Sequence, residues 1–300
     1  MYNGLRMQRM KRYTTSPFAT HEDNIFTQIE GMVEEVLNWN NSLEIPVIIS
    51  FKNNAIRKLI RCFFCNQNKP VALGFAGETA SGKTTIANEI ISELENFASE
   101  KNIENFITKI NMDNYYYDRS QEVIKAGSFD KFVENYDLDS PSAFELDLFA
   151  KHLDLLKQGN QVLLPLYDMS GTAKRWDNRI LATPSRIIVT EGLYTFTDVA
   201  QAGFDIKFYV DIDEDVQKAR WYRRAKDRDL GASADRVYNN ALSKAKIYIR
   251  PTKENADIIL NGEASIEVYK LFIQKVMDIV RELTVAQAVK KEEELELVRS

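Results

Sequence analysis

The sequence has 300 residues, 44% of them hydrophobic and 28% charged, which suits one large or two small globular domains with a sizeable core. The formal net charge of -5 gives no support to a nucleic-acid partner, because proteins that bind nucleic acids usually carry a basic excess. No apolar run approaches the roughly 20 residues that span a bilayer, so no membrane partner is expected.

Residues 1–69 predict a mostly helical N-terminal extension without recognisable chemistry. Apolar residues at helical spacing indicate a helix over 22–40, and a second helix is expected over about 51–65. The two cysteines, Cys62 and Cys65, form a single CFFC pattern in the second segment. This pattern favours two reduced thiols, while a zinc site or a redox pair stays open. We therefore expect a reducing, cytoplasmic compartment.

From Val71 onwards, short apolar runs alternate with helical patterns. The runs expected to form strands are 71–76, 105–110, 162–166, 186–190, 206–212 and 256–260. One helix is expected after the glycine-rich stretch, another from Ser140-Pro141, and a last one from about 265 to 284. The alternation predicts an α/β domain over 70–284, with a mainly parallel sheet and helices on both faces, and then a charged tail over 285–300.

The stretch GETASGKTT, residues 77–85, fits the phosphate-loop pattern G-x-x-x-x-G-K-S/T at every fixed position. Its glycines let the backbone N–H groups point at phosphate oxygens, and the following helix presents its positive N-terminal end to the same anion. The residues expected to bind a nucleoside triphosphate are Gly77, Glu78, Thr79, Ala80, Ser81, Gly82, Lys83, Thr84 and Thr85. The pattern alone does not separate a kinase from an ATPase or a GTPase.

Two carboxylates come directly after predicted strands. Asp113 follows the strand over 105–110, and Glu191 follows the strand over 186–190. Ligands of parallel sheets bind beyond the carboxyl ends of the strands, so both side chains are expected near the phosphate loop. Asp113 could accept a proton from an alcohol, and Glu191 could hold Mg²⁺ with Thr84. A polar loop with tyrosines on its rim is the alternative for residues 113–118.

Four arginines occur within nine residues of an otherwise acidic chain. They are Arg220, Arg223, Arg224 and Arg228, on a stretch with helical character. A guanidinium matches a phosphate group in a bidentate manner, so the pattern favours a lid over the triphosphate, at about residues 217–250. A solvated basic helix face is the alternative.

Taken together, these motifs resemble the uridine–cytidine kinase family, within the phosphoribulokinase/uridine kinase group of P-loop kinases. The resemblance covers about residues 71–262. The segments that carry it, in order, are GETASGKTT, MDNYYY, DSPSAFELDLF, LPLYDMS, VTEGLY, FYVDIDEDVQKARWYRR and RPTKENADIIL. It implies a P-loop kinase fold of three layers, ATP and Mg²⁺ as cofactors, and a nucleoside as the acceptor. Because family members often form tetramers, a homo-oligomer is compatible with it.

The resemblance also implies a role for each matching position. On the donor side, Lys83 and Thr84 hold phosphate and Mg²⁺, Glu191 assists the metal, and Arg224 reaches the phosphates from the lid. The resemblance extends the same lid role to two further arginines, Arg223 as a substrate-binding residue and Arg228 as a nucleotide-binding residue.

On the acceptor side, the resemblance makes Asp113 the base that accepts a proton from the ribose 5′-hydroxyl. Tyr116 would line the nucleoside pocket, Asp139 would bond the ribose hydroxyls, and Tyr167 would contact the base. Two positions depart from the family: Leu138 replaces a phenylalanine, and Thr172 replaces a histidine that reads the pyrimidine. A kinase of another small alcohol, such as a sugar phosphate or a pantothenate-like molecule, therefore stays open. A non-catalytic nucleotide-binding protein is a further alternative.

Overall fold

The computed structural model describes residues 21–52, 55, 58, 69–227, 230–279, 281 and 282. The strands are β1 (Ile48–Phe51), β2 (Val71–Gly77), β3 (Ile107–Asn111), β4 (Val162–Leu164), β5 (Ile180–Ala182), β6 (Ile187–Glu191), β7 (Ile206–Asp211) and β8 (Ile258–Asn261). The α-helices are α1 (His21–Ser42), α3 (Lys83–Glu100), α4 (Ser120–Ala126), α5 (Phe129–Val133), α6 (Leu146–Lys157), α7 (Glu214–Asp227) and α8 (Ala234–Lys244), and a last helix covers 266–279.

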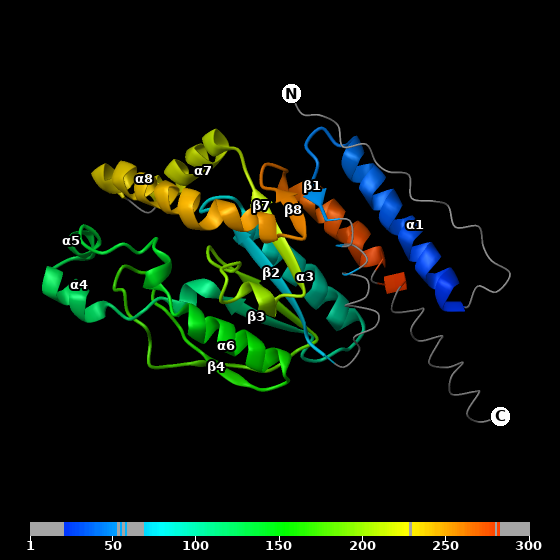
Figure 1. Cartoon of the computed structure of the whole chain (residues 1–300), viewed down its shortest axis with the longest axis horizontal. Helices are drawn as coiled ribbons and strands as arrows, with labels where there is room; N and C mark the ends of the chain where they lie inside the picture. Colours follow the sequence, from blue (N-terminus) through cyan, green and yellow to red (C-terminus); the bar gives the residue numbers. More distant parts are fainter. Residues whose placement is uncertain are drawn as a thin grey trace.

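Six of these strands form one central sheet in the order β1-β8-β7-β2-β6-β3 (Figure 1). The pairs β8–β7, β7–β2, β2–β6 and β6–β3 are parallel, whereas β1 pairs with β8 in the antiparallel direction. The predicted α/β architecture with a mainly parallel sheet is therefore confirmed. None of the described helices is both long and apolar enough to cross a membrane.

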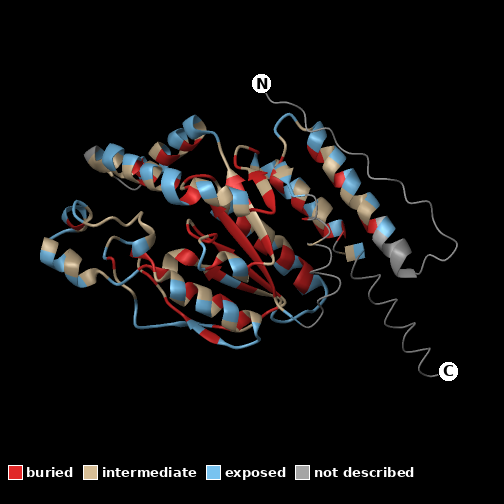
Figure 2. Cartoon of the chain, in the orientation of Figure 1, coloured by how far each residue is buried: buried red, intermediate tan, exposed pale blue. Residues whose placement is uncertain are grey.

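The central strands are buried on both faces, as Figure 2 shows for the middle of the molecule. On β2, Ala72 and Ala76 belong to one hydrophobic cluster, which includes buried residues of α6. Val71, Leu73 and Phe75 alternate with them and belong to the other cluster, which includes buried residues of α3 and of the last helix. Side chains alternate between the faces of a strand, so helices cover both sides of the sheet in three layers.

The N-terminal extension contributes a strand to this sheet, which the sequence did not predict. At its start, the buried Asn40 accepts a hydrogen bond from the Ile48 amide at 2.8 Å and donates one to the Ile48 carbonyl at 3.0 Å. This buried amide ties the end of α1 to β1. The helix predicted over 22–40 is confirmed as α1, which lies beside the last helix, where Lys275 stacks over the Trp39 ring (Figure 1).

The helix predicted over 51–65 falls mostly outside the described residues, as do Cys62 and Cys65. Within it, Ala55 and Lys58 are helical, but Phe51 is the last residue of β1. The prediction was therefore wrong at its start, because the run from Ile48 to Phe51 pairs with β8.

The run 162–166 does not join the central sheet, contrary to expectation. Its residues Val162–Leu164 form β4, which pairs antiparallel with β5 in a separate two-stranded sheet. Val162 and Leu164 are buried while Leu163 is 58% exposed, which is the alternation of a strand with one covered face. Pro165 lacks the amide that a further ladder bond would need.

The helix expected from Ser140-Pro141 begins later than predicted. Ser140 does accept a hydrogen bond from the Ser142 amide at 3.3 Å, but it caps only a 3-10 turn over Pro141–Ala143. Phe144 then adopts an extended conformation and pairs with Tyr116, so α6 starts at Leu146.

Candidate functional site

The register of the sheet brings the predicted carboxylates to one edge. Glu191, at the end of β6, lies opposite Phe75 of β2 and opposite Asn111 of β3. The phosphate loop begins two residues after Phe75, and Asp113 follows two residues after Asn111. The loop and both carboxylates therefore meet beyond the carboxyl ends of three adjacent strands, where ligands of parallel sheets bind.

The phosphate loop has the backbone that its sequence predicts. Gly82 adopts φ 96°, in the left-handed region, and leads into α3 at Lys83. Gly77 has φ 155°, and a Cβ built on it would lie 2.7 Å from the Val210 carbonyl oxygen and 2.8 Å from Ser81 Oγ. Only glycine fits this position, because the strand β7 and the loop itself occupy the space of a side chain.

The far end of the loop carries a hydroxyl–carboxylate pair. The Thr84 hydroxyl donates a hydrogen bond of 2.9 Å to Glu191 Oε2, and Glu191 is only 3% exposed. The described residues include no group of three or more His, Cys, Asp or Glu side chains that could hold a metal ion. One hydroxyl and one carboxylate fit Mg²⁺, which usually takes one or two protein oxygens together with phosphate oxygens and waters. The Ser81 hydroxyl is buried without a hydrogen-bond partner in the described structure, within the same loop.

A second set of contacts joins the phosphate loop to α7 and α8, which we call the lid helices. Glu78 accepts hydrogen bonds from Arg250, at 2.5 Å from Nε and 3.2 Å from Nη2, and these bonds raise the pKa of Arg250. Gln217 of α7 donates to the Thr79 carbonyl at 3.0 Å and accepts from the Tyr238 hydroxyl of α8 at 3.3 Å. The loop is therefore held from both lid helices and from the segment that follows them.

The arginines of α7 differ in where they lie. Arg220 donates to the Gly262 carbonyl at 2.6 Å, and its Nη1 lies 3.8 Å from the Cβ position of Gly82. Arg223 and Arg224, which the sequence singled out, are exposed on the same helix. Arg228 lies outside the described residues. Among the described arginines of this run, Arg220 is thus the one that these contacts place beside the phosphate loop.

At the end of β3, a 3-10 turn over Met112–Tyr115 carries Asp113. The Asn111 side chain accepts a hydrogen bond from the Asp113 amide at 2.9 Å, which fixes the start of the turn, and the Asp113 side chain is half-buried. Burial raises the pKa of Tyr116 well above its usual value, and Asp113 and Asp139 both add to this rise. Both carboxylates therefore act electrostatically on the same tyrosine.

Asp139 lies in the loop between α5 and the 3-10 turn at Pro141. Its carboxylate accepts a hydrogen bond from Asn240 at 3.2 Å, and its carbonyl accepts one from the Tyr194 hydroxyl. Burial raises the pKa of Asp139 to about 6; the bond from Asn240 and Lys244 oppose this rise, whereas Asp137 adds to it.

Tyr167 joins the same aromatic group. Its ring centroid lies 5.0 Å from that of Tyr116, which in turn lies 3.9 Å from that of Phe144. Leu138 packs at the edge of the same hydrophobic cluster. Thr172 is exposed and donates to the Asp168 carboxylate at 2.7 Å within its own loop. The structure thus brings Asp113, Tyr116, Asp139 and Tyr167 together, while the Thr172 hydroxyl is engaged locally.

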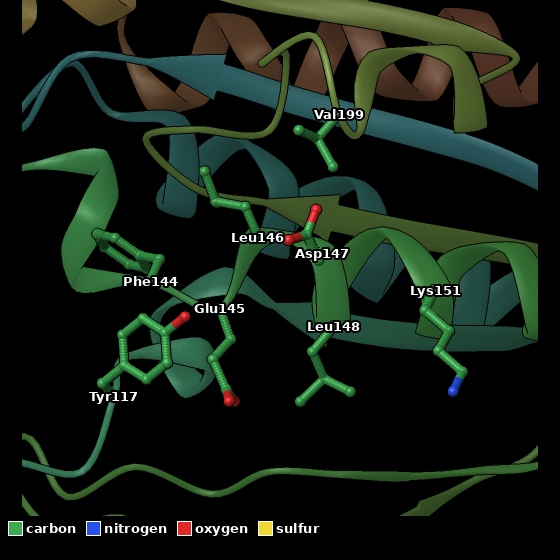
Figure 3. A pocket seen from close by; sticks show the side chains of 8 residues that line it. All are labelled: Tyr117, Phe144, Glu145, Leu146, Asp147, Leu148, Lys151 and Val199. Carbon is green, nitrogen blue, oxygen red and sulfur yellow. The ribbon is translucent and has the colours of Figure 1, made fainter.

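A pocket of about 520 Å³ adjoins this group on the side of α6. Figure 3 shows Tyr117 and Phe144 at one end, Lys151 at the other, and Glu145 and Asp147 between them. Its lining residues include none of Lys83, Asp113 and Asp139. Phe144 lines the pocket and its ring packs against that of Tyr116, so the pocket is a neighbour of this aromatic group.

No role was predicted from the sequence for Gln217, Asn240 or Arg250, and Arg220 was named only as one of four arginines of the lid. Arg220 was visible in the arginine run, but only helix α7 shows which of its arginines turns towards Gly82. Asn240 carried no signal, and Arg250 stood in the segment RPTKENADIIL without an assigned role, because their partners lie about 100 and 172 residues away.

A strand, a glycine-rich loop and a helix at the centre of a parallel sheet, with two helices packed against the loop, define a P-loop nucleotide-binding fold. Comparison with known proteins agrees. The model of the phosphoribulokinase/uridine kinase family matches residues 72–268. A uridine kinase of Halobacterium salinarum is 32% identical over 217 residues, covering 71% of this chain and 89% of that protein. A uridine kinase of Clostridium novyi is 31% identical over 223 residues, covering 71% and 98%.

Among solved structures, a protein of a Silicibacter species, provisionally assigned as a fructose transport system kinase, superposes with a TM-score of 0.50 and 18% identity, covering 68% of this chain and 95% of that one. This likeness concerns the fold alone. The chain belongs to the phosphoribulokinase/uridine kinase family, and it is an ATP-dependent small-molecule kinase of the uridine kinase type.

Proposed function

We propose that the protein transfers the γ-phosphoryl group of ATP to the 5′-hydroxyl of a nucleoside such as uridine or cytidine. The observation that supports the proposal is the position of Asp113, which follows β3 at the sheet edge that also holds the phosphate loop, with Tyr116 in the same segment. Asp113 and Asp139 both raise the pKa of Tyr116. One carboxylate suits proton abstraction, and a second beside an aromatic ring suits a sugar with vicinal hydroxyls. The relatives named uridine kinase support the same acceptor.

Each residue of the site has a defined task in this reaction. The loop amides and Lys83 bind the triphosphate. The oxygen of the acceptor hydroxyl forms a bond to the γ-phosphorus while the bond between that phosphorus and the ADP oxygen breaks, and Asp113 accepts the proton of the hydroxyl. Thr84 and Glu191 would hold Mg²⁺, which neutralises charge on the phosphate oxygens when it is bound. Asp139 would accept hydrogen bonds from the ribose, and Tyr167 would contact the base.

A second candidate is a kinase of another small alcohol, because Thr172 supplies no imidazole and its hydroxyl is bonded to Asp168. A coupled ADP-release assay across nucleosides, sugar phosphates and vitamin precursors separates the two. We expect turnover of uridine or cytidine, lost in Lys83→Ala. Turnover of a sugar phosphate alone would favour the second candidate. ATP binding without turnover of any acceptor would favour a non-catalytic role.

A further inference from the structure

One face of α8 rests on the loop that carries Asp139. Arg236, Asn240 and Lys244 are spaced four residues apart, so they lie along one side of the helix. Arg236 donates to the Val133 carbonyl at 3.2 Å, and Lys244 pairs with Asp137 at 2.7 Å. Asn240 lies between them. In Figure 1, one end of α8 is drawn above α5, which leads into this loop.

Asn240 contacts both carboxylates of the loop. Its Nδ2 donates to Asp137 Oδ1 at 2.8 Å and to Asp139 Oδ2 at 3.2 Å. The Tyr194 hydroxyl holds the Asp139 carbonyl, so Asp139 is fixed through its backbone and through one carboxylate oxygen. Within the described part of the chain, no hydrogen bond reaches the other oxygen, Oδ1. That oxygen is the one left to accept from a bound acceptor.

The opposite side of α8 contacts the phosphate loop. Tyr238 is buried in a small cluster with Ala80 of the loop and Trp221 of α7. Its hydroxyl donates to Gln217, which donates to the Thr79 carbonyl. Residues 238 and 240, two positions apart on a helix, therefore point to opposite sides, one to the donor and one to the acceptor.

We propose that Asn240 is a positioning residue for the acceptor: it orients the Asp139 carboxylate from the lid helix α8, whose other side rests on the phosphate loop. The proposal rests on the proposed function, in which Asp139 binds the acceptor. Asn240 acts through Asp139 and touches no reacting atom. The acceptor pocket is therefore complete only when α8 is docked against the loop that carries Asp139.

The test compares three variants by steady-state kinetics. Asn240→Ala removes the donor, and Asn240→Asp keeps the shape but places a third carboxylate beside Asp137 and Asp139. Asn239→Asp is the matched control, since Asn239 is the exposed neighbour on the same helix. We expect the KM for the nucleoside to rise about tenfold in Asn240→Ala and further in Asn240→Asp, because hydrogen bonds to charged groups are strong. The KM for ATP and kcat should stay within about twofold of the wild type.

A second measurement needs no substrate. Hydrogen–deuterium exchange of residues 133–139 should rise in Asn240→Asp and stay unchanged in Asn239→Asp. An Asn240→Asp variant with the wild-type nucleoside KM, or with unchanged exchange in this segment, would overturn the proposal. If the wild type phosphorylates no nucleoside, the proposed function fails, but this inference can still be tested. The kinetic measurement then uses whichever alcohol is turned over, and the hydrogen–deuterium exchange still decides whether Asn240 docks α8.

Discussion

Arg250 forms a two-point contact with Glu78, with its Nε 2.5 Å from Oε1 and its Nη2 3.2 Å from Oε2. Glu78 is the first variable residue of the phosphate loop, so a carboxylate stands where a triphosphate is expected to bind. The guanidinium offsets that negative charge, and it also contacts Glu214 of α7 at 2.9 Å. This pair explains how the loop tolerates an acid at this position.

Removing the guanidinium should therefore weaken nucleotide binding. We expect Arg250→Ala to raise the KM for ATP about tenfold, which corresponds to about 1.4 kcal/mol, because Glu78 then repels the phosphates. The double variant Glu78→Gln with Arg250→Ala should recover most of this loss. The ATP affinities of the wild type, the two single variants and the double variant together form a double-mutant cycle, which measures the coupling between Glu78 and Arg250. Additive losses in the double variant would show that the two residues act independently.

The close fit of Gly77 leads to a second prediction. Gly77→Ala places a methyl group against the Val210 carbonyl and Ser81, so the loop must shift and ATP binding should fall severely. Gly31→Ala is the control: Gly31 lies exposed in α1 with nothing within 4 Å of its Cβ position. That change should raise the free energy of unfolding by about 0.5–1 kcal/mol, because alanine favours a helix. Thermal unfolding and ATP titration of both variants test the contrast.

The assignment of Asp113 as the base predicts a specific loss of chemistry. Asp113→Asn keeps the shape of the turn but cannot take the proton, so kcat should fall by roughly 100- to 10,000-fold. ATP affinity, measured by calorimetry, should change less than about twofold, since the phosphate loop is untouched. A variant with wild-type kcat would exclude this role for Asp113.

The environment of Asp139 predicts a dependence on pH. With its pKa raised to about 6, Asp139 gains charge as the pH rises through 6, and only the charged form accepts hydrogen bonds through both oxygens. Nucleoside affinity should therefore increase between pH 5 and pH 7. Asp139→Asn should bind more weakly, with a flatter profile over this range. An identical profile in the variant would assign the titration to another group.

The raised pKa of Asp139 also makes the free energy of unfolding depend on pH. The folded pKa lies above the ordinary value of 3.8, so the folded state holds the proton more tightly. The contribution of Asp139 to the free energy of unfolding is thus full below pH 4 and is lost as the pH rises towards 6. Chemical denaturation of the wild type and of Asp139→Asn at pH 4, 5, 6 and 7 isolates this contribution from those of other carboxylates.

The sequence predicted the parts of this molecule that depend on local pattern. The phosphate loop, the strands around it and the last helix each follow from residues that are close in the chain. Prediction from the sequence failed where the structure depends on pairing between segments that are distant in the chain. Ile48–Phe51 became a strand because β8 offers an edge, and Val162–Leu164 left the central sheet because β5 pairs with it.

The residues of the candidate site fall into the same two groups, those with a local sequence pattern and those defined by distant contacts. Lys83, Thr84, Asp113 and Glu191 were predicted from their positions in the chain, since each stands at a strand end or a helix start. Asn240 and Arg250 could not be found, because an isolated asparagine or arginine acquires meaning only from the carboxylate that it meets across the fold. The roles of all these side chains remain predictions for the experiments above.

The place of β1 has a practical consequence for anyone who prepares a shortened protein. A fragment that starts at residue 70 would contain every motif of the kinase, yet it would lose the strand that pairs with β8. The backbone groups of Ile258, Ile259 and Leu260 would then form an open, apolar sheet edge, which is a template for association between chains. Such a fragment is expected to aggregate on purification, whereas one that begins before α1 keeps this edge covered.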